Sequence, residues 1–153
     1  MAQSSLCGNL QVEIETKAPA GKLHEAFCKA YDIPKACPEK VKSVDLQEGE
    51  WGTVGSITTW TYLIEGKPEI CKMMTEAVDY DNKSQTFKTI GGDILKYYKS
   101  FKYSMKVIPK DEGSLLHISL EYEKLNNEVP DPNSMLDLVT SSCKDVDTYL
   151  TRA

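Results

Sequence analysis

The chain has 153 residues, a length that fits one domain whose core is large enough to fold without disulfides or metals. Its hydrophobic fraction of 41% and charged fraction of 27% are ordinary for a globular protein in water. With a net charge of −5 and a pI of about 5.1, it has no overall field that attracts a polyanion, which argues against nucleic acid or an anionic membrane as the main partner.

The N-terminus and the cysteines indicate a cytoplasmic protein. The opening residues MAQSSLCGNLQVEIE lack the basic and apolar regions of a secretion signal, and no apolar run approaches the roughly 18 residues that span a bilayer. The five cysteines are odd in number and scattered, with no C-x-x-C pair, so we expect reduced and mostly buried thiols. His24 and His117 are too isolated to build a zinc site with them, and we expect neither metal nor cofactor.

The first part of the chain predicts one strand and two short helices. Residues 10–14 alternate apolar and polar side chains, which is typical of a strand with one buried face. In the segment 17–40, Pro19 suits a first helical turn and apolar side chains follow at helical spacing. Asp32 can start a second short helix, which Pro38 would stop.

The rest of the chain predicts six strands and one long helix. Short turns rich in glycine, aspartate and asparagine separate the expected strands, which gives an antiparallel meander over 41–48, 56–66, 69–78, 84–90, 100–109 and 114–125. From Asp131, a plausible N-cap followed by Pro132, the period changes to that of an amphipathic helix of about 20 residues. We therefore expect one α+β domain over 1–153. A curved sheet around one helix tends to leave a cavity between them.

The stretch GGDILKYYKSFKY, residues 91–103, could be a phosphate loop, a basic strip for nucleic acid, or part of a strand. A phosphate loop needs Lys-Ser or Lys-Thr and then a helix, but here a strand follows. In that strand Phe101 and Tyr103 fall on one face, whereas Lys102 and Lys106 fall on the other. Aromatic and basic side chains thus do not share a surface, and the sequence favours an ordinary strand with an outer row of lysines.

The inner faces of the predicted strands mix aromatic side chains with hydroxyls and an amide. Residues of this kind are Trp60, Tyr62, Gln85, Phe87, Phe101, Tyr103, Ile118 and Tyr122. A dry core favours aliphatic side chains there, because each buried polar group needs a partner. A cavity for an amphipathic molecule needs the mixture, but a filled core whose polar groups bond one another explains it equally well. Periodicity leaves both readings open.

Three segments resemble one known family. They are EGEWGTVGSI, IGGDILKYYKSFKYSMKVIPK and the closing EYEKLN with the helix after it, and their order is similar to that in the major latex proteins of plants. This family is a branch of the superfamily of the birch-pollen allergen and the pathogenesis-related class 10 proteins. The motif GD-[IL]-L-x-x-Y-K-x-F, present at Gly92–Phe101, looks specific to the latex branch, whereas the glycine turn is shared more widely.

The resemblance implies a helix-grip fold: a curved seven-stranded antiparallel sheet around a long C-terminal helix, two short helices in a V, and an internal cavity. It also implies that the cavity takes a steroid, flavonoid, hormone or alkaloid type of ligand, with Ile33, Pro34 and Gly92 near its rim. Matching positions suggest a lining of Phe27, Trp60, Tyr62, Met74, Gln85, Phe87, Phe101, Tyr103, Met105, Ile118, Tyr122, Leu138, Val139 and Ser142.

Family members look like carriers, stores or sensors in plant defence and specialised metabolism, yet some relatives in alkaloid pathways are enzymes. Lys72 and Glu76 share strand parity with Met74 and could face the cavity as an acid–base pair, or they form an exposed strand end or ion pair. His24 could shuttle protons at the mouth, although a partly exposed helix histidine is commoner. Tyr103 and Tyr122 are candidate polar handles for a ligand.

We therefore expect a binder of a small hydrophobic or amphipathic molecule, with an isomerase or condensing enzyme of alkaloid metabolism as the alternative. We expect no nucleic acid, no membrane insertion, and a monomer or weak dimer. A protein partner that senses the liganded rim, as in related hormone receptors, stays open.

Overall fold

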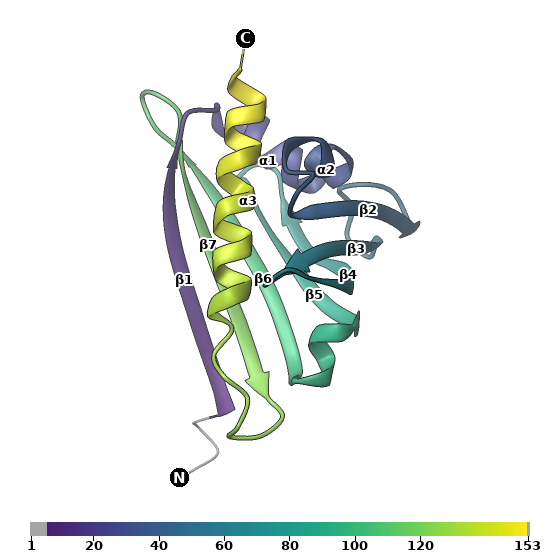
Figure 1. Cartoon of the computed structure of the whole chain (residues 1–153). Coiled ribbons are helices and arrows are strands. Elements are labelled where there is room, and N and C mark those ends of the chain that lie inside the picture. Colours follow the sequence, from purple (N-terminus) through teal and green to yellow (C-terminus); the bar gives the residue numbers. More distant parts are fainter. Residues whose placement is uncertain (1–5, 153) are drawn as a thin grey trace.

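The computed structural model describes residues 6–152, which form one antiparallel sheet of seven strands around a long helix (Figure 1). The elements are β1 (Cys7–Thr16), α1 (Ala20–Cys28), a 3₁₀ turn (Ala30–Asp32), α2 (Ile33–Ala36), β2 (Val41–Glu48), β3 (Ile57–Ile64), β4 (Lys67–Asp79), β5 (Ser84–Gly92), the 3₁₀ turn η3 (Asp93–Lys96), β6 (Tyr98–Pro109), β7 (Ser114–Lys124) and α3 (Asn133–Thr151).

The strand order is β1-β7-β6-β5-β4-β3-β2, so every connection from β2 to β7 joins neighbouring strands. Only β1 is out of sequence, and it pairs antiparallel with β7 from Cys7–Glu123 to Thr16–Ser114. The predicted meander and the α+β helix-grip class are confirmed. Residues 1–5 and 153 lie outside the described part, so the expectations of one domain over 1–153 and of an N-terminus without a signal stay predictions.

Helix α3 crosses the concave side of the sheet. The short helices α1 and α2 cover the end of the sheet that lies beside the C-terminus of α3 (Figure 1). A buried carboxylate fixes the helix at this end. The backbone N–H of Lys17 donates to both oxygens of Asp147, at 3.1 and 2.9 Å, and that of Ala18 donates to Oδ1 at 2.8 Å. The turn between β1 and α1 is thereby bonded to the last turns of α3.

The start of α3 differs from the prediction. The helix begins at Asn133 with Pro132 in the cap position, and no side chain caps it. Asp131, the predicted cap, is engaged elsewhere, since its Oδ1 accepts from the Tyr122 hydroxyl at 2.9 Å and from the Lys124 ammonium at 2.9 Å. The carboxylate closes the β7–α3 connection instead of capping the helix.

The turn at Gly92 shows what the latex-type motif does. Gly92 has φ +107°, and a Cβ atom there would lie 2.2 Å from the carbonyl oxygen of Ile70, so no other residue fits. Asp93 follows, and its carboxylate accepts the Ile70 N–H at 2.8 Å and pairs with Lys96 at 3.0 Å. The motif thus forms the turn from β5 through η3 to β6, and Asp93 bonds this turn to β4.

The interior divides into two clusters of buried side chains. The V-helix cluster lies under α1 and α2 and is mainly aliphatic: Ile14, Ala18, Ala20, Leu23, Phe27, Ala30, Ile33, Cys37, Val41, Val44, Met105, Val107, Leu116, Ile118, Cys143 and Val146. The aromatic cluster surrounds the other half of the sheet: Tyr62, Cys71, Met73, Ile94, Tyr98, Phe101, Tyr103, Leu120, Tyr122, Val129 and Met135. Trp60 and Val139 pack against both.

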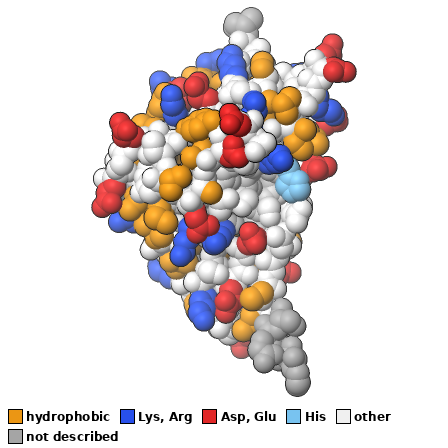
Figure 2. All heavy atoms as spheres, turned by 180° about the vertical axis from the view of Figure 1, so that it is seen from behind, with side chains coloured by type: hydrophobic (Ala, Val, Ile, Leu, Met, Phe, Trp, Pro, Cys, Tyr) orange, Lys and Arg blue, Asp and Glu red, His pale blue; other side chains and the backbone are white. Residues whose placement is uncertain are grey.

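The surface and the cysteines bear on the remaining expectations. Acidic and basic side chains are interspersed on the face seen from behind (Figure 2) and are not gathered by sign. No helix within residues 6–152 is long and apolar enough to cross a membrane. The five cysteines all lie in the described part and are free thiols, of which Cys7 is exposed and the others are buried.

Candidate functional site

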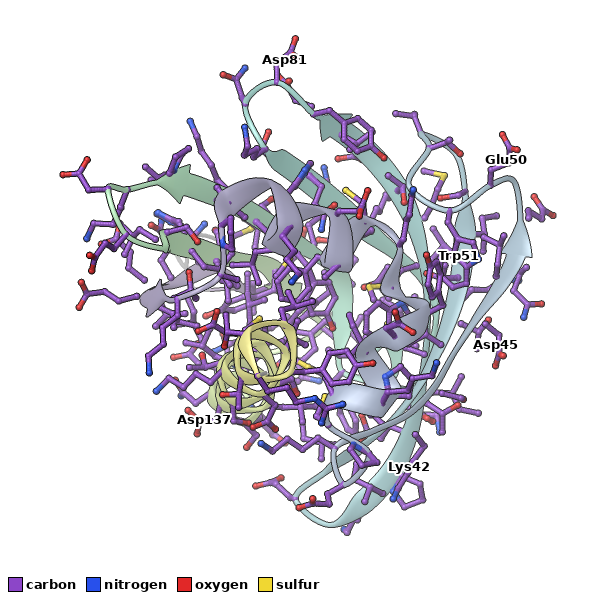
Figure 3. All side chains as sticks on the ribbon, turned by 90° about the horizontal axis from the view of Figure 1, so that it is seen from above. Lys42, Asp45, Glu50, Trp51, Asp81 and Asp137 are labelled. Atoms are coloured by element: carbon purple, nitrogen blue, oxygen red, sulfur yellow. The ribbon has the colours of Figure 1, made fainter. Side chains whose placement is uncertain are left out.

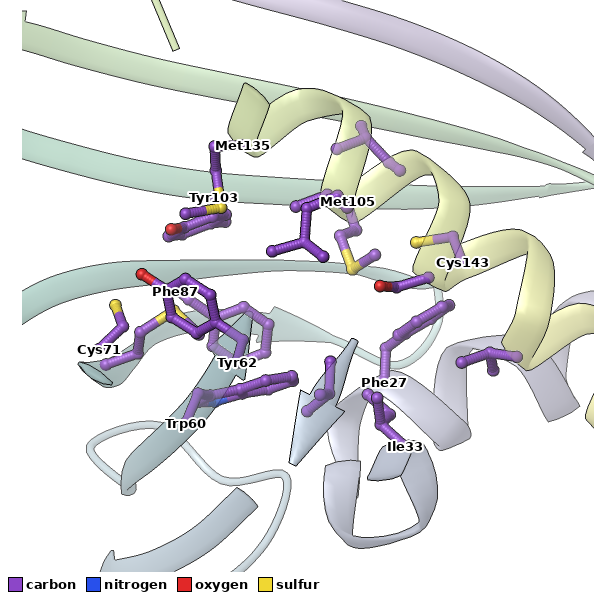
Figure 4. A pocket seen from close by; sticks show the side chains of 17 residues that line it. Phe27, Ile33, Trp60, Tyr62, Cys71, Phe87, Tyr103, Met105, Met135 and Cys143 are labelled. Carbon is purple, nitrogen blue, oxygen red and sulfur yellow. The ribbon is translucent and has the colours of Figure 1, made fainter. Parts of the chain in front are cut away.

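A cavity of about 100 Å³ lies where the two clusters meet (Figure 4). Ten of the residues predicted to line it do so: Phe27, Trp60, Tyr62, Phe87, Tyr103, Met105, Ile118, Leu138, Val139 and Ser142. Seven further side chains complete the wall: Ile33, Val41, Cys71, Met73, Met135, Cys143 and Val146.

Two periodicities build this wall. Alternate residues of the strands point toward α3, so Tyr103 and Met105 of β6 both reach the cavity while Lys102 and Lys106 face outward. On α3 the contributing residues recur at steps of three and four, from Met135 to Val146. Phe27, near the end of α1, closes the side beneath the short helices.

Met74 was predicted for the cavity, but the structure places it on the other face of β4. Cys71, Met73 and Thr75 are the buried, inward residues of this strand, and Lys72 and Met74 alternate with them. Both faces of β4 carry apolar side chains, so parity alone could not choose between them. The pairing of Tyr62 with Glu69 across β3 and β4 fixes the register that decides it.

Phe101 and Tyr122 were also predicted for the lining, yet they lie in solid core beside the cavity. Phe101 is fully buried, with its ring centroid 5.0 Å from that of Tyr103 and 6.2 Å from that of Tyr122. The Tyr122 hydroxyl, proposed as a polar handle for a ligand, donates to Asp131 instead. The aromatic cluster is therefore the filled core that periodicity had left open as an alternative.

Gln85 points inward as its parity predicts, but it lies under α1 and outside the cavity wall. Its Oε1 accepts the thiol of Cys28 at 2.7 Å, and its Nε2 lies 3.5 Å from the sulfur of Met105. The amide thus anchors the helix to the sheet.

The missed lining residues carried signals of different strength. Met135 and Val146 belong to the helical stripe that the sequence shows, so extending the lining along that stripe finds them. Cys71 and Met73 required the register of β4, which the sequence does not display. Val41 begins β2 directly below α2, where only the folded chain brings it to the cavity.

Lys72 and Glu76, the residues considered as an acid–base pair, do not line the cavity. Lys72 is exposed, and Glu76 pairs with Lys102 at 3.0 Å on the outer face of the sheet, as the ion-pair alternative expected. His117 is on the same face, with Nε2 3.0 Å from Oε1 of Gln11. The orientation assumed for a catalytic Lys72–Glu76 pair is thus wrong.

His24 is buried, which corrects the expectation of a partly exposed histidine. It is 3% exposed, with Nε2 3.3 Å from the carbonyl oxygen of Ser84 and 3.5 Å from the sulfur of Cys28, and its ring meets that of Tyr80 edge-on. Burial lowers the pKa of this imidazole and raises the pKa of the Cys28 thiol to about 11. The pair is neutral and does not border the cavity.

The ionisable side chains that line the cavity are also neutral. Burial raises the pKa of Cys71 to about 11, and it raises the pKa of Cys143, Tyr62 and Tyr103 as well. At neutral pH the lining therefore presents phenols and thiols without charge.

The Tyr62 hydroxyl and the indole N–H of Trp60 already have partners in the protein. The Tyr62 hydroxyl donates to Oε1 of Glu69 at 3.2 Å, and the indole N–H of Trp60 donates to Thr58 Oγ1 at 3.0 Å. The Tyr103 phenol lies beside the thiol of Cys71, a contact that adds to the rise in its pKa caused mainly by burial.

Ser142 is different from these groups. Its Oγ is the one buried side-chain N or O atom within residues 6–152 that has no hydrogen-bond partner in the protein. A buried hydroxyl without a partner costs about 1–3 kcal/mol of stability.

Of the three residues expected near the rim, Ile33 lines the cavity, whereas Pro34 and Gly92 do not. A second hollow of about 140 Å³ lies outside, between α1, α2 and α3, and its floor includes Ile33 and Val146. These two side chains line both hollows and therefore form the wall between them. Figure 3 looks down on α3 end-on with the short helices beside it, and the exposed side chains of Lys42, Asp45 and Glu50 lie at the periphery of this view.

Comparison with known proteins places this geometry in a family. The model of the Pathogenesis-related protein Bet v 1 family matches residues 5–153. MLP-like protein 31 of Arabidopsis thaliana is 42% identical over 150 residues, which is 96% of this chain and 88% of that protein. The chain spans 45% of another Arabidopsis relative, MLP-like protein 28, again at 42% identity over 96% of this chain.

Solved structures of other proteins have the same fold as this chain. Ginseng major latex-like protein 151 from Panax ginseng superposes with a TM-score of 0.92 at 36% identity, covering 96% of this chain and 99% of that one. Norcoclaurine synthase from Thalictrum flavum, solved in complex with dopamine and hydroxybenzaldehyde, has a TM-score of 0.75 at 17% identity over 99% of this chain and 92% of that one, which shows a shared fold alone. The chain belongs to the Bet v 1 family of pathogenesis-related proteins, in its major latex protein branch.

Proposed function

We propose that the protein binds a hydrophobic or amphipathic small molecule in the cavity and acts as a carrier, store or sensor for it. The observation that carries the proposal is an uncharged, mainly apolar cavity between the sheet and α3, at the junction of the two packed clusters. Shape and apolar burial drive binding, at about 25 cal/mol for each Å² of apolar surface removed from water.

Keeping the cavity is costly for the fold. At roughly 24 cal/mol per Å³, a cavity of about 100 Å³ corresponds to about 2 kcal/mol of stability relative to a filled core. Protein interiors otherwise pack like organic crystals. A larger side chain at Val139 or Ser142 would fill the space, so the small residues there favour a role for the cavity itself.

The wall can adapt to a ligand larger than the present space. Cavities that hold drug-sized ligands measure about 300–1,000 Å³, which exceeds the volume here. Met73, Met105 and Met135 line the cavity, and the unbranched methionine side chain changes shape at little cost. The thin wall of Ile33 and Val146 gives the ligand its route from the outer hollow.

One contact favours a second candidate, an acid–base enzyme. Glu69 accepts the Tyr62 hydroxyl at the cavity wall, and burial raises the pKa of this carboxyl, so it holds a proton more readily than an exposed glutamate does. In this alternative the phenol and carboxyl relay a proton to a bound substrate. Conversion of supplied compounds that is lost in Glu69→Gln would establish it.

We extend the proposal to the compartment, the biological role and the oligomeric state. Five free cysteines, most of them buried, support a reducing compartment, and we place the protein in the cytoplasm. We assign it to plant defence or specialised metabolism as a monomer or weak dimer, with the small molecule as its main partner.

Calorimetric titration with 2-naphthol, a compact amphipathic probe, tests the proposal. The native protein should bind it, and Val139→Phe, which fills the cavity, should abolish binding. Val54→Phe makes the same change at a side chain that is 63% exposed and should bind as the native protein does. Equal binding by all three proteins, or by none, would contradict the proposal.

A further inference from the structure

We propose that Ser142 recognises the ligand through a hydrogen bond to one neutral polar substituent, a hydroxyl or carbonyl, on an otherwise apolar molecule. This inference rests on the proposed function, because it names the chemistry that the cavity selects. It assigns recognition to α3 and not to the tyrosines of the sheet.

The first argument is the unsatisfied state of the serine hydroxyl. Ser142 is 9% exposed, it lines the cavity, and its Oγ has no partner among the described protein groups. Other hydroxyls of α3 donate to carbonyl oxygens of the preceding turn: Ser141 to Leu138 at 3.2 Å and Thr151 to Asp147 at 2.8 Å. This local bond is the usual solution for a helical serine or threonine. Ser142 instead keeps its hydroxyl at the cavity.

The second argument is that the thiol of Cys37, the polar group beside Ser142, already has a hydrogen-bond partner. The thiol of Cys37 donates to the carbonyl oxygen of Ile33 at 3.4 Å. Ser142 lies close enough to lower the pKa of this thiol, which burial raises overall, but the two make no hydrogen bond of good geometry. The serine hydroxyl thus retains both its donor and its acceptor capacity for a ligand.

The third argument compares the other polar atoms of the lining. A ligand that bonded the Tyr62 hydroxyl would compete with Glu69, and one that bonded the indole N–H of Trp60 would compete with Thr58. Such an exchange gains little, because one hydrogen bond replaces another. At Ser142 the ligand adds a bond where the protein has none.

The uncharged lining sets the ligand class. A carboxylate or ammonium group placed beside Ser142 would lose its water without a countercharge among the lining residues. A hydroxyl or carbonyl has a far smaller desolvation cost, and both can bond to a serine. The geometry therefore points to a neutral alcohol, phenol or ketone with an apolar body.

Two probes of matched shape test this. 2-Naphthol carries a hydroxyl group where 2-methylnaphthalene carries a methyl group, and the two are otherwise identical. Each probe is titrated by calorimetry into the native protein, Ser142→Ala, Ser142→Thr and Tyr103→Phe. We expect the native protein to prefer 2-naphthol and Ser142→Ala to lose roughly threefold to tenfold of that preference. Its affinity for 2-methylnaphthalene should stay the same. Ser142→Thr keeps the hydroxyl, Tyr103→Phe keeps Ser142, and both should keep the preference.

Each contrary result has its own meaning. A preference that survives in Ser142→Ala, or that disappears in Tyr103→Phe, would overturn the role of Ser142 while leaving ligand binding intact. Equal weakening of both probes in Ser142→Ala would show a structural role and overturn it too. Failure of the native protein to bind either probe would overturn the proposed function together with this inference. Thermal melting of Ser142→Ala, expected to match or exceed that of the native protein, checks that the variant folds.

Discussion

Tyr98 and Tyr122 of the aromatic cluster differ from Ser142 at the cavity in whether their hydroxyl groups have a partner in the protein. In the aromatic cluster the Tyr98 hydroxyl donates to the carbonyl oxygen of Pro130 at 2.7 Å, and the Tyr122 hydroxyl donates to Asp131. At the V-helix end the mainly aliphatic cluster borders the cavity, and there Ser142 has no partner in the protein. Polar groups at the first end hold the fold together, whereas the serine at the second end is available to a ligand.

This contrast resolves the two readings that periodicity left open. A filled core and a cavity both exist, side by side, on the same inner face of the sheet. Phe101 belongs to the first and Tyr103, two residues later on β6, belongs to the second. Residue type does not separate them, because aromatic side chains occur in both regions, but the cavity also holds one buried hydroxyl, that of Ser142, without a partner in the described part of the protein.

The largest expected effect tests the filled end. Phe101→Ala should cost about 3–5 kcal/mol of unfolding free energy, because it opens a cavity in tightly packed aromatic core. The matched change Phe87→Ala, at a half-buried ring that already borders the cavity, should cost clearly less. Denaturant titration of both variants measures this, and equal losses would mean that the two regions are packed alike.

A somewhat smaller loss of stability is expected when Asp147, which bonds α3 to the turn before α1, is changed. Asp147→Asn replaces a charged acceptor of three backbone N–H bonds and should cost about 1.5–3 kcal/mol, as measured by denaturant titration. Asp137→Asn, an exposed position on the same helix, is the control and should change stability little. Equal unfolding free energies of the two variants would mean that the hydrogen bonds of Asp147 contribute nothing to stability.

The hydrogen bond between Tyr122 and Asp131, beside the aromatic cluster, should contribute less to stability. Tyr122→Phe removes the hydroxyl that donates to the exposed carboxylate of Asp131, and we expect a loss of about 0.5–1.5 kcal/mol. Since the ring stays in place, affinity for 2-naphthol should not change. A fall in that affinity would bring Tyr122 back as a ligand handle.

The smallest effect concerns pH. Burial holds the pKa of His24 below its ordinary value of 6.5, with Lys83 lowering it further and Asp79 opposing. The unfolded chain therefore binds more protons than the folded one as the pH falls, so the stability due to neutral His24 is complete above pH 6.5 and is lost as the pH drops through the folded pKa.

Melting temperatures recorded from about pH 7 to about pH 5 check this. The native protein should lose stability more steeply than His24→Gln over that range, and His117→Gln should behave as the native protein does. Parallel curves for all three proteins would exclude His24 as the group responsible.

Sequence reasoning reached the fold because the strands β3, β5, β6 and β7 alternate cleanly and α3 has a strict helical stripe. The latex-type motif then supplied the family. Those same alternations placed Tyr103, Met105 and Ile118 at the cavity. The start of α3 was misplaced because a plausible cap, Asp131, has stronger partners that are distant from the helix.

The remaining errors have one physical origin. The alternation along a strand predicts which face of the sheet a side chain lies on, but not whether the cavity or packed core lies opposite it. Phe101 and Gln85 do point inward, yet each lies at an end of its strand where packing or α1 occupies the space. β4 has apolar side chains on both faces, so only its pairing with β3 separates Met73 from Met74. The unpaired state of Ser142 is a property of the folded chain alone.

The most direct measurement is native mass spectrometry of the protein after incubation with a plant extract and repurification, with Val139→Phe treated in parallel. We predict one or more noncovalent small-molecule adducts on the native protein, each carrying a hydroxyl or carbonyl and unchanged by the incubation, and none on Val139→Phe. Bare protein in both samples would contradict ligand binding in the cavity. Recovered molecules that differ chemically from those supplied would identify an enzyme and not a carrier.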